Sequence, residues 1–149
     1  MYLLMPLNLP PYPFKITNKG GQLFVFDEIR KKELVLTPEE WVRQHFVQYL
    51  IHQKKYGRAL IKLEGGLKNN SKAMRTDIVV FDNTGQKILI VECKAPSVKI
   101  NQQVLDQIAR YNWVHRVPYL AVTNGLQHYY FKIDFEKERF ELIDDIGPA

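Results

Sequence analysis

A short apolar run that ends in charged residues constrains the fold of this chain more than any other feature. Residues 88–91, Ile-Leu-Ile-Val, have the length and composition of a buried strand and lead directly into Glu92-Cys93-Lys94. Side chains two apart in a strand share a face, so Glu92 and Lys94 point one way and Cys93 the other. Buried charges are costly unless they pair or bind a metal. The pattern therefore predicts a polar site at the end of this strand.

A hairpin brings a second carboxylate toward the same place. Residues 76–81 are strand-like, and a tight turn at 83–85 joins them to the apolar strand. A turn centred between residues 84 and 85 would place Asp77 opposite Glu92. A turn centred on residue 84 would place Asp77 opposite Val91, and a bulge would be needed to realign it. Both registers are compatible with the sequence.

Two carboxylates that converge on one point form a hard oxygen site suited to Mg²⁺. Such a metal lowers the pKa of a bound water and stabilises charge on a phosphoryl oxygen. A neighbouring lysine can orient the attacking water or neutralise developing negative charge. Asp77, Glu92 and Lys94 are therefore a sufficient set for phosphodiester hydrolysis.

The remaining patterns predict two helices and several further strands. Thr37-Pro38-Glu39-Glu40 is a strong helix start, with Thr37 as the cap and Glu40 completing a capping box. This helix is expected to run to about Lys55 and to end at Gly57, and a second helix is expected at 101–115. Further strands are expected at 22–26, 33–36, 59–64, 119–123, 128–133 and 139–143. The order predicts an α/β (α+β) fold, with one mixed β-sheet flanked by helices.

The 149 residues fit a single domain, 1–149. We expect an N-terminal arm and β-hairpin in 1–36, the arm being an extended segment that lies on the domain. The core is expected in 37–134, and a C-terminal strand and tail in 135–149.

Composition indicates the cellular compartment of the protein and the kind of partner that it can bind. A single cysteine, Cys93, rules out an internal disulfide. No run approaches the roughly 20 apolar residues that a membrane span needs, and no basic region precedes the apolar N-terminus. We therefore expect a cytoplasmic protein that does not enter membranes. The formal charge of +5 permits a polyanionic partner without showing one.

The order and spacing of the charged residues resemble the PD-(D/E)XK nuclease superfamily. Asp77, fourteen intervening residues and Glu92-x-Lys94 resemble its bipartite motif, with Thr76 in place of the usual proline. Gln107 and Tyr111, four apart on one helical face, match the QxxxY pattern of type I restriction R subunits and RecB-like nucleases.

The first helix extends this resemblance. Glu40-Trp-Val-Arg43 resembles the acidic first-helix motif of the superfamily. The spacing over 37–131 looks most like the N-terminal nuclease domain of type I restriction enzyme R proteins, in a stand-alone form. Because the sequence contains no GxxxxGK[ST] phosphate loop, the ATP-driven motor of those R subunits is not expected in this chain.

The resemblance implies a restriction-endonuclease-like fold and a Mg²⁺-dependent endodeoxyribonuclease, with Mn²⁺ able to substitute. It implies a catalytic set of Asp77, Glu92, Lys94, Glu40 and Gln107. Asp77 and Glu92 would be metal ligands together with the backbone carbonyl of Cys93. Glu40 would approach the metal directly or through water, and Gln107 would support the site or contact nucleic acid.

Several of these residues have structural alternatives. The capping box alone explains Glu40, while Glu39 is expected on a different side of the helix. Gln107 and Tyr111 also fit an interior amide and a packed aromatic ring. Arg75 could contact phosphate or pair with a neighbouring acid. The strand alternation makes Cys93 a small core residue and not a nucleophile.

The functional hypothesis is an endonuclease of a restriction-modification or repair system. It would hydrolyse phosphodiester bonds in DNA by in-line attack of a metal-activated water. The alternative is a non-catalytic or partner-dependent nucleic-acid-binding accessory subunit that keeps the nuclease fold. The expected partners are DNA and other restriction or repair subunits, and a homodimer is compatible with cutting both strands. The sequence leaves open whether the substrate is DNA or RNA.

Overall fold

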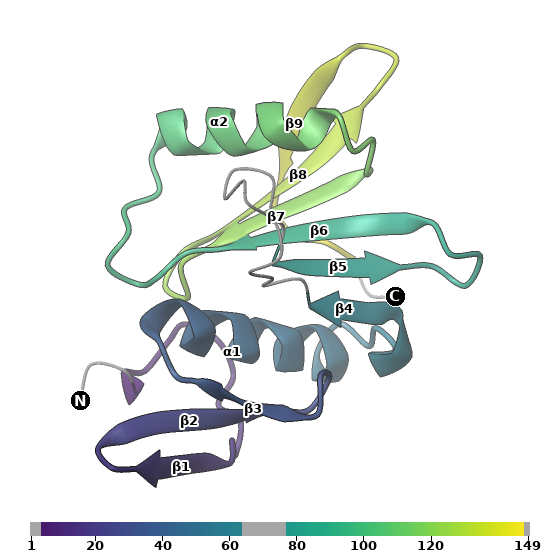
Figure 1. Ribbon diagram of the computed structural model, residues 1–149. Helices are drawn as coiled ribbons and strands as arrows, with labels where there is room; N and C mark the ends of the chain where they lie inside the picture. Colours follow the sequence, from purple (N-terminus) through teal and green to yellow (C-terminus); the bar gives the residue numbers. More distant parts are fainter. Residues whose placement is uncertain (1–3, 64–76, 148–149) are drawn as a thin grey trace.

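The largest sheet of the protein is built around the apolar strand seen in the sequence. The computed structural model describes residues 4–63 and 77–147. The strands of this sheet are β4 (Ile61–Leu63), β5 (Ile78–Phe81), β6 (Lys87–Cys93), β7 (Tyr119–Thr123), β8 (His128–Asp134) and β9 (Arg139–Ile143). They lie in the order β4-β5-β6-β7-β8-β9, with β6 and β7 parallel and the other neighbours antiparallel (Figure 1). The predicted mixed sheet and the α+β class are confirmed.

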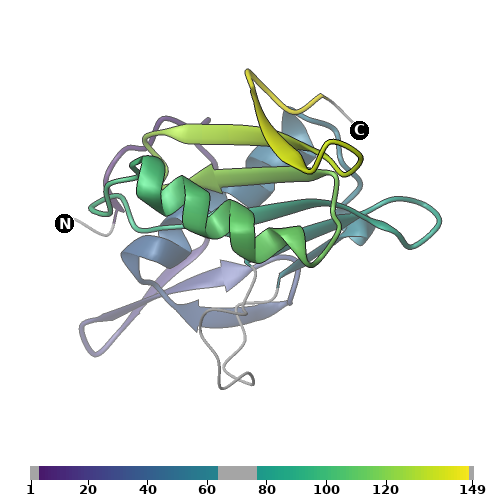
Figure 2. The same ribbon diagram turned by 90° about the horizontal axis from the view of Figure 1, so that it is seen from above.

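Strand β6 is central because both of its faces are apolar. Leu89, Val91 and Cys93 pack in the cluster that includes helix α1 (Pro38–His52). Ile90 packs in the second cluster, which includes helix α2 (Gln102–Trp113). The two helices therefore cover opposite faces of the sheet, and Figure 2 shows α2 lying over the strands.

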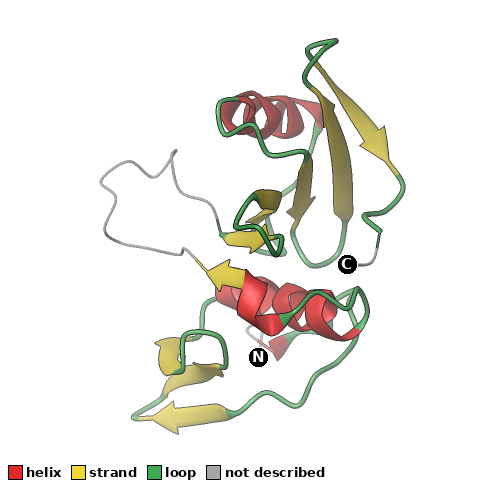
Figure 3. Cartoon of the chain, turned by 90° about the vertical axis from the view of Figure 1, so that its right-hand side faces the viewer, coloured by secondary structure: helices red, strands yellow, loops and turns green. Residues whose placement is uncertain are grey.

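Helix α1 lies between two sheets and so buries polar as well as apolar side chains (Figure 3). Thr37 Oγ1 accepts the Glu40 N–H at 3.0 Å, which confirms the predicted cap. The helix ends at His52, and the expectation that it reaches Lys55 and ends at Gly57 is wrong. The left-handed residue after the helix is Lys55, with φ 65°, whereas Gly57 has φ −67° and precedes the short 3₁₀ helix η2 (Arg58–Leu60).

The N-terminal segment forms three strands, not the predicted two. They are β1 (Ile16–Lys19), β2 (Gln22–Asp27) and β3 (Lys32–Val35), paired antiparallel in the order β1-β2-β3. Strand β1 follows a proline-rich stretch and holds one apolar residue in four, so alternation did not reveal it. Gly20 and Gly21, with φ 61° and 90°, make the turn into β2.

The residues before β1 lie on the domain as the expected extended arm. Trp41 Nε1 donates to the Met5 carbonyl at 2.9 Å, and the Asn8 N–H donates to the Gly125 carbonyl at 2.8 Å. These contacts tie the arm to α1 and to the β7–β8 turn.

The predicted strand 59–64 begins later than expected, because η2 occupies its first residues and β4 starts at Ile61. Within the described residues, no helix has the length and apolar character that crossing a membrane requires.

Candidate active site

The turn that joins β5 and β6 centres on residue 84. The Asp82 N–H donates to the Gln86 carbonyl at 2.8 Å. The Asp82 carboxylate accepts the Thr84 and Gln86 N–H groups at 2.8 and 3.0 Å, which closes the turn. This is the second of the two registers considered above, in which Asp77 would face Val91 without a correction.

A β-bulge between residues 80 and 81 supplies that correction. Beyond the bulge Ile78 pairs with Val91, and continuing this register by one residue places Asp77 level with Glu92. The bulge therefore brings the two predicted carboxylates to the same end of the sheet.

Asp77 is buried and held at both carboxylate oxygens. Its Oδ2 accepts the Cys93 N–H at 2.7 Å, and its Oδ1 accepts from Arg43 Nη2 at 2.6 Å. One bond fixes Asp77 to the end of β6, and the other fixes it to α1. Its orientation is therefore set by two separate elements.

Glu92 and Lys94 point the same way, as predicted, and Lys94 Nζ lies 3.5 Å from Glu92 Oε2. Burial and the negative charge of Asp77 raise the pKa of Glu92 to about 7, while Lys94 acts in the opposite direction. Lys94 does not cancel the effects of burial and of Asp77 on Glu92, so the net shift of the Glu92 pKa is upward.

Cys93 lies between these residues in the sequence but faces the other way. Its thiol is buried in the core against α1, as the alternation predicted. Burial and the charge of Asp77 raise the pKa of the Cys93 thiol well above its usual range. A thiol in this setting is not activated as a nucleophile.

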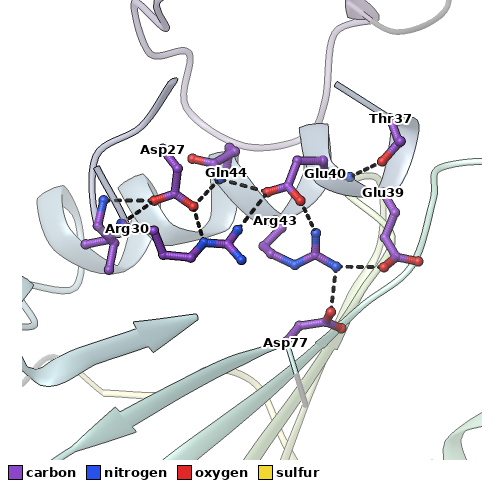
Figure 4. A network of polar contacts seen from close by, with 9 residues as sticks. Asp27, Arg30, Thr37, Glu39, Glu40, Arg43, Gln44 and Asp77 are labelled. Carbon is purple, nitrogen blue, oxygen red and sulfur yellow. Dashed lines mark hydrogen bonds and ion pairs between the residues drawn. The ribbon is translucent and has the colours of Figure 1, made fainter. Parts of the chain in front are cut away.

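Arg43 is the centre of the acidic end of α1. Its Nη1 donates to Glu40 Oε1 at 2.5 Å, and its Nη2 donates to Glu39 Oε2 and Asp77 Oδ1, both at 2.6 Å. Figure 4 shows the guanidinium between these carboxylates. Burial lowers the pKa of Arg43, but the charges of Asp77 and Glu40 outweigh it and the net shift is upward. Arg43 is therefore a permanent cation.

Two sequence-based expectations about α1 need correction. Glu39 is not turned away from the site, since it shares the Arg43 nitrogen that binds Asp77. Arg43 was missed as a site residue, although its spacing of four from Glu39 and three from Glu40 could have indicated it.

The capping box does not explain Glu40. Its backbone N–H is capped by Thr37, but its carboxylate oxygens accept from Arg43 Nη1 and from Gln44 Nε2, the latter at 2.8 Å. Glu40 is buried, and it is joined to Asp77 through Arg43.

The QxxxY residues lie on α2. Gln107 is exposed, so the interior-amide alternative is wrong. Among the described residues, Gln107 takes no part in the hydrogen bonds that hold Asp77 and Glu40. The Tyr111 ring packs edge-on against His115, with centroids 5.2 Å apart. Arg75 lies outside the described residues, as does Thr76.

The donor set can be tested against the divalent cation that the resemblance implies. Among the described residues, no group of three or more His, Cys, Asp and Glu side chains is placed to hold a metal ion. The resemblance also implied that Glu40 approaches the metal directly or through water, but Glu40 does not join Asp77 and Glu92 as a third carboxylate ligand in the described part of the chain. The set that remains is Asp77 and Glu92 with the Cys93 carbonyl. Asp77 and Glu92 supply carboxylate oxygens at one end of the sheet, and the Cys93 carbonyl would add a third hard oxygen donor. The residues therefore fit a hard divalent cation.

Comparison with known proteins finds a matching family model and a similar solved structure. Residues 38–147 match the family model described as the type I restriction enzyme R protein N terminus. Among solved structures, the chain is similar to a fragment described as an HsdR subunit of a type I restriction enzyme from Vibrio vulnificus YJ016. The two are 16% identical with a TM-score of 0.49, over 74% of this chain and 23% of that one. The chain thus spans less than a quarter of that solved chain. No curated protein matches the sequence.

Proposed function

We propose that this chain, which belongs to the family of type I restriction enzyme R protein N termini, is a metal-dependent endonuclease that hydrolyses phosphodiester bonds in DNA. Family membership gives a nuclease-related role. The observation that carries the finer proposal is the meeting of Asp77 and Glu92 at one end of the sheet, with Lys94 3.5 Å from Glu92.

The proposed cofactor is Mg²⁺, with Mn²⁺ able to substitute, held by Asp77, Glu92 and the Cys93 carbonyl. When bound, such an ion supplies a water of lowered pKa and stabilises negative charge on phosphoryl oxygens. The two hydrogen bonds to Asp77 would keep its carboxylate aligned with Glu92. A rigid ligand pair of this kind lowers the cost of organising the site.

Lys94 is the residue proposed to act on the substrate. Its side chain is about one third exposed (32%), so it can reach a bound phosphate while staying beside Glu92. From there its ammonium can donate to the attacking water or to a phosphoryl oxygen that gains charge during in-line displacement. We propose that Gln107, which is exposed on α2, contacts nucleic acid.

The proposed partners are DNA and other subunits of a restriction or repair system. The basic character of the chain, with a net charge of +5, would favour association with a polyanion. A homodimer would let two sites cut the two strands of a duplex.

One observation favours a second candidate, a partner-dependent accessory subunit. Arg43 already supplies a cation to Asp77 at 2.6 Å, and both side chains are buried, with 6% and 5% exposed. If that pair does not adjust, Asp77 has one oxygen fewer for a metal. Cleavage would then need a partner that repositions α1.

Nicking of supercoiled plasmid with Mg²⁺ or Mn²⁺ tests the proposal. The wild type is compared with Glu92→Gln, and with Glu141→Gln as a control on the exposed face of β9. We expect metal-dependent nicking that Glu92→Gln abolishes and Glu141→Gln keeps. Equal nicking by all three proteins would indicate a contaminant and refute the assignment of Glu92. No nicking by the wild type would favour the accessory subunit.

A further inference from the structure

A buried polar connection runs from the N-terminal sheet to the candidate site. It begins at Asp27, the last residue of β2, which is completely buried and lies outside the residues that match the family model. Asp27 Oδ1 accepts the N–H groups of Ile29 and Arg30, both at 2.8 Å, and so shapes the β2–β3 turn. Its Oδ2 faces α1 and accepts from Arg30 Nε at 2.7 Å and Gln44 Nε2 at 3.0 Å. Oδ1 therefore stabilises the turn, and Oδ2 contacts the side chains of Arg30 and Gln44.

Gln44 joins this turn to the acidic end of α1. Its single amide nitrogen donates to Asp27 Oδ2 and, at 2.8 Å, to Glu40 Oε2 (Figure 4). An amide NH₂ carries two donors, so it can bridge two carboxylates that would otherwise repel each other. Arg30 Nη2, 3.5 Å from Glu40 Oε2, adds positive charge at the same oxygen. The hydrogen bonds that Gln44 makes to the two carboxylates restrict the positions of all three side chains, while Arg30 Nη2 and Arg43 Nε in the same network are buried without a hydrogen-bond partner among the described residues.

The hydrogen bond from Gln44 to Glu40 Oε2 sets the direction of the other carboxylate oxygen of Glu40. With Oε2 occupied by Gln44, Oε1 is turned to Arg43 Nη1. That bond in turn leaves Arg43 Nη2 directed at Asp77 Oδ1. The contacts thus form one continuous series from the N-terminal sheet to a proposed metal ligand.

We propose that Asp27 and Gln44 are positioning residues of the active site, and that the N-terminal sheet is a working part of it. They act through Glu40 and Arg43, which align Asp77. The inference relies on the proposed function for the chemistry at Asp77, but the alignment itself can be measured without catalysis.

The test compares Gln44→Met with Gln48→Met. Both glutamines are buried and lie four residues apart on α1, and methionine keeps their length while removing the amide. Gln48 differs because its Oε1 accepts from His52 Nε2 at 3.2 Å and, within residues 4–63 and 77–147, its amide donates to no carboxylate. Three quantities are measured for each protein: the ¹⁵N NMR signals of the Arg43 guanidinium, the Mn²⁺ dissociation constant by calorimetry, and plasmid nicking.

We expect Gln44→Met to shift or broaden the Arg43 signals and to weaken Mn²⁺ binding and nicking by about 10- to 100-fold, as losses of outer-shell contacts do. Gln48→Met should leave all three unchanged. In a Glu40→Gln background, adding Gln44→Met should change Mn²⁺ binding by less than about twofold, because both act along one series of contacts.

Other outcomes separate the two proposals. Unchanged Arg43 signals and Mn²⁺ affinity in Gln44→Met would overturn the positioning role, as would equal losses in both variants. If the wild type neither binds Mn²⁺ nor nicks DNA, and the Arg43 signals change only in Gln44→Met, the proposed nuclease function is refuted. The proposal that Gln44 aligns Arg43 and Asp77 is then supported. If Gln44→Met does not fold, Asp27→Asn repeats the comparison, because it keeps Oδ1 for the turn and changes the group that faces Gln44 and Arg30.

Discussion

Arg43 Nη2 donates to Asp77 Oδ1 at 2.6 Å, and this contact links α1 to the residue that precedes β5. The same guanidinium also binds Glu39 and Glu40, so one positive charge serves three carboxylates. The acidic end of α1 and the end of the sheet are therefore a single electrostatic unit. A substitution of any one of these four residues should therefore change the positions of the others.

Replacing Arg43 with methionine should destabilise the protein strongly. The change leaves Asp77 and Glu40 buried without their cation, and breaking a buried ion pair costs about 3–5 kcal/mol. The free energy of unfolding in urea at pH 7 measures the effect. Arg58→Met is the matched control, because the Arg58–Glu28 pair is exposed and should contribute less than about 1 kcal/mol. Equal losses in both variants would contradict the importance of the buried cluster.

Glu92 should make the protein less stable as the pH rises. Burial and Asp77 raise the pKa of Glu92 to about 7, so the folded protein keeps a proton that the unfolded chain has released. Between about pH 4.5 and 7 the unfolded state therefore binds fewer protons, and stability falls with pH in that window. Glu92→Gln cannot ionise and should escape the loss, which is at most about 3 kcal/mol.

Thermal unfolding in EDTA at pH 4.5 and pH 8 checks this expectation. The wild type and Glu92→Gln should have similar midpoints at pH 4.5, and the variant should be the more stable at pH 8. A variant that is less stable than the wild type at pH 8 would show that ionised Glu92 stabilises the fold.

Strand β6 and the α1 cap were predictable because each depends on local chemistry. The run 88–91 can only be a buried segment, and Thr37-Pro38 has the cap and first-turn residues of a helix. The alternation also placed Glu92 and Lys94 on one face and Cys93 on the other. These features need no knowledge of the rest of the chain.

The features that assemble the site depend on contacts between distant segments. The bulge between residues 80 and 81 decides which residue faces Glu92, and no local pattern marks it. Arg43 meets Asp77 34 residues away only because α1 packs on this face of the sheet. Asp27 is likewise an ordinary turn residue until α1 brings Gln44 to its second oxygen.

Divalent metal should stabilise the wild type through Asp77 and Glu92 if the proposed cofactor is correct. A ligand at 100 times its dissociation constant stabilises the folded state by about 2.7 kcal/mol. We expect the midpoint of thermal unfolding at pH 8 to rise with Mn²⁺ concentration in the wild type and to stay constant in Glu92→Gln. The same rise in both proteins would place metal binding elsewhere and remove Glu92 from the ligand set.

Gly125 should not tolerate a larger residue, because side chains of the arm and of α1 both pack close to its Cα. It has φ 87°, and a Cβ there would lie 2.9 Å from Leu7 Cδ2 and 3.0 Å from Val42 Cγ2. Gly85 has the same φ of 87° but no atom within 4 Å of an added Cβ. Gly85→Ala should therefore cost only the left-handed backbone penalty of about 1–2 kcal/mol. Gly125→Ala should add an overpacking cost of about 1–3 kcal/mol.

The difference between these two variants in urea unfolding isolates the packing of the arm. Because the Asn8 N–H donates to the Gly125 carbonyl at 2.8 Å, displacement of Leu7 should also expose the arm to limited proteolysis in Gly125→Ala alone. Equal destabilisation of the two variants, with the arm equally resistant to protease, would mean that the arm moves away from the added methyl group without lowering the free energy of unfolding. In that case the arm contributes little to holding α1 against the sheet.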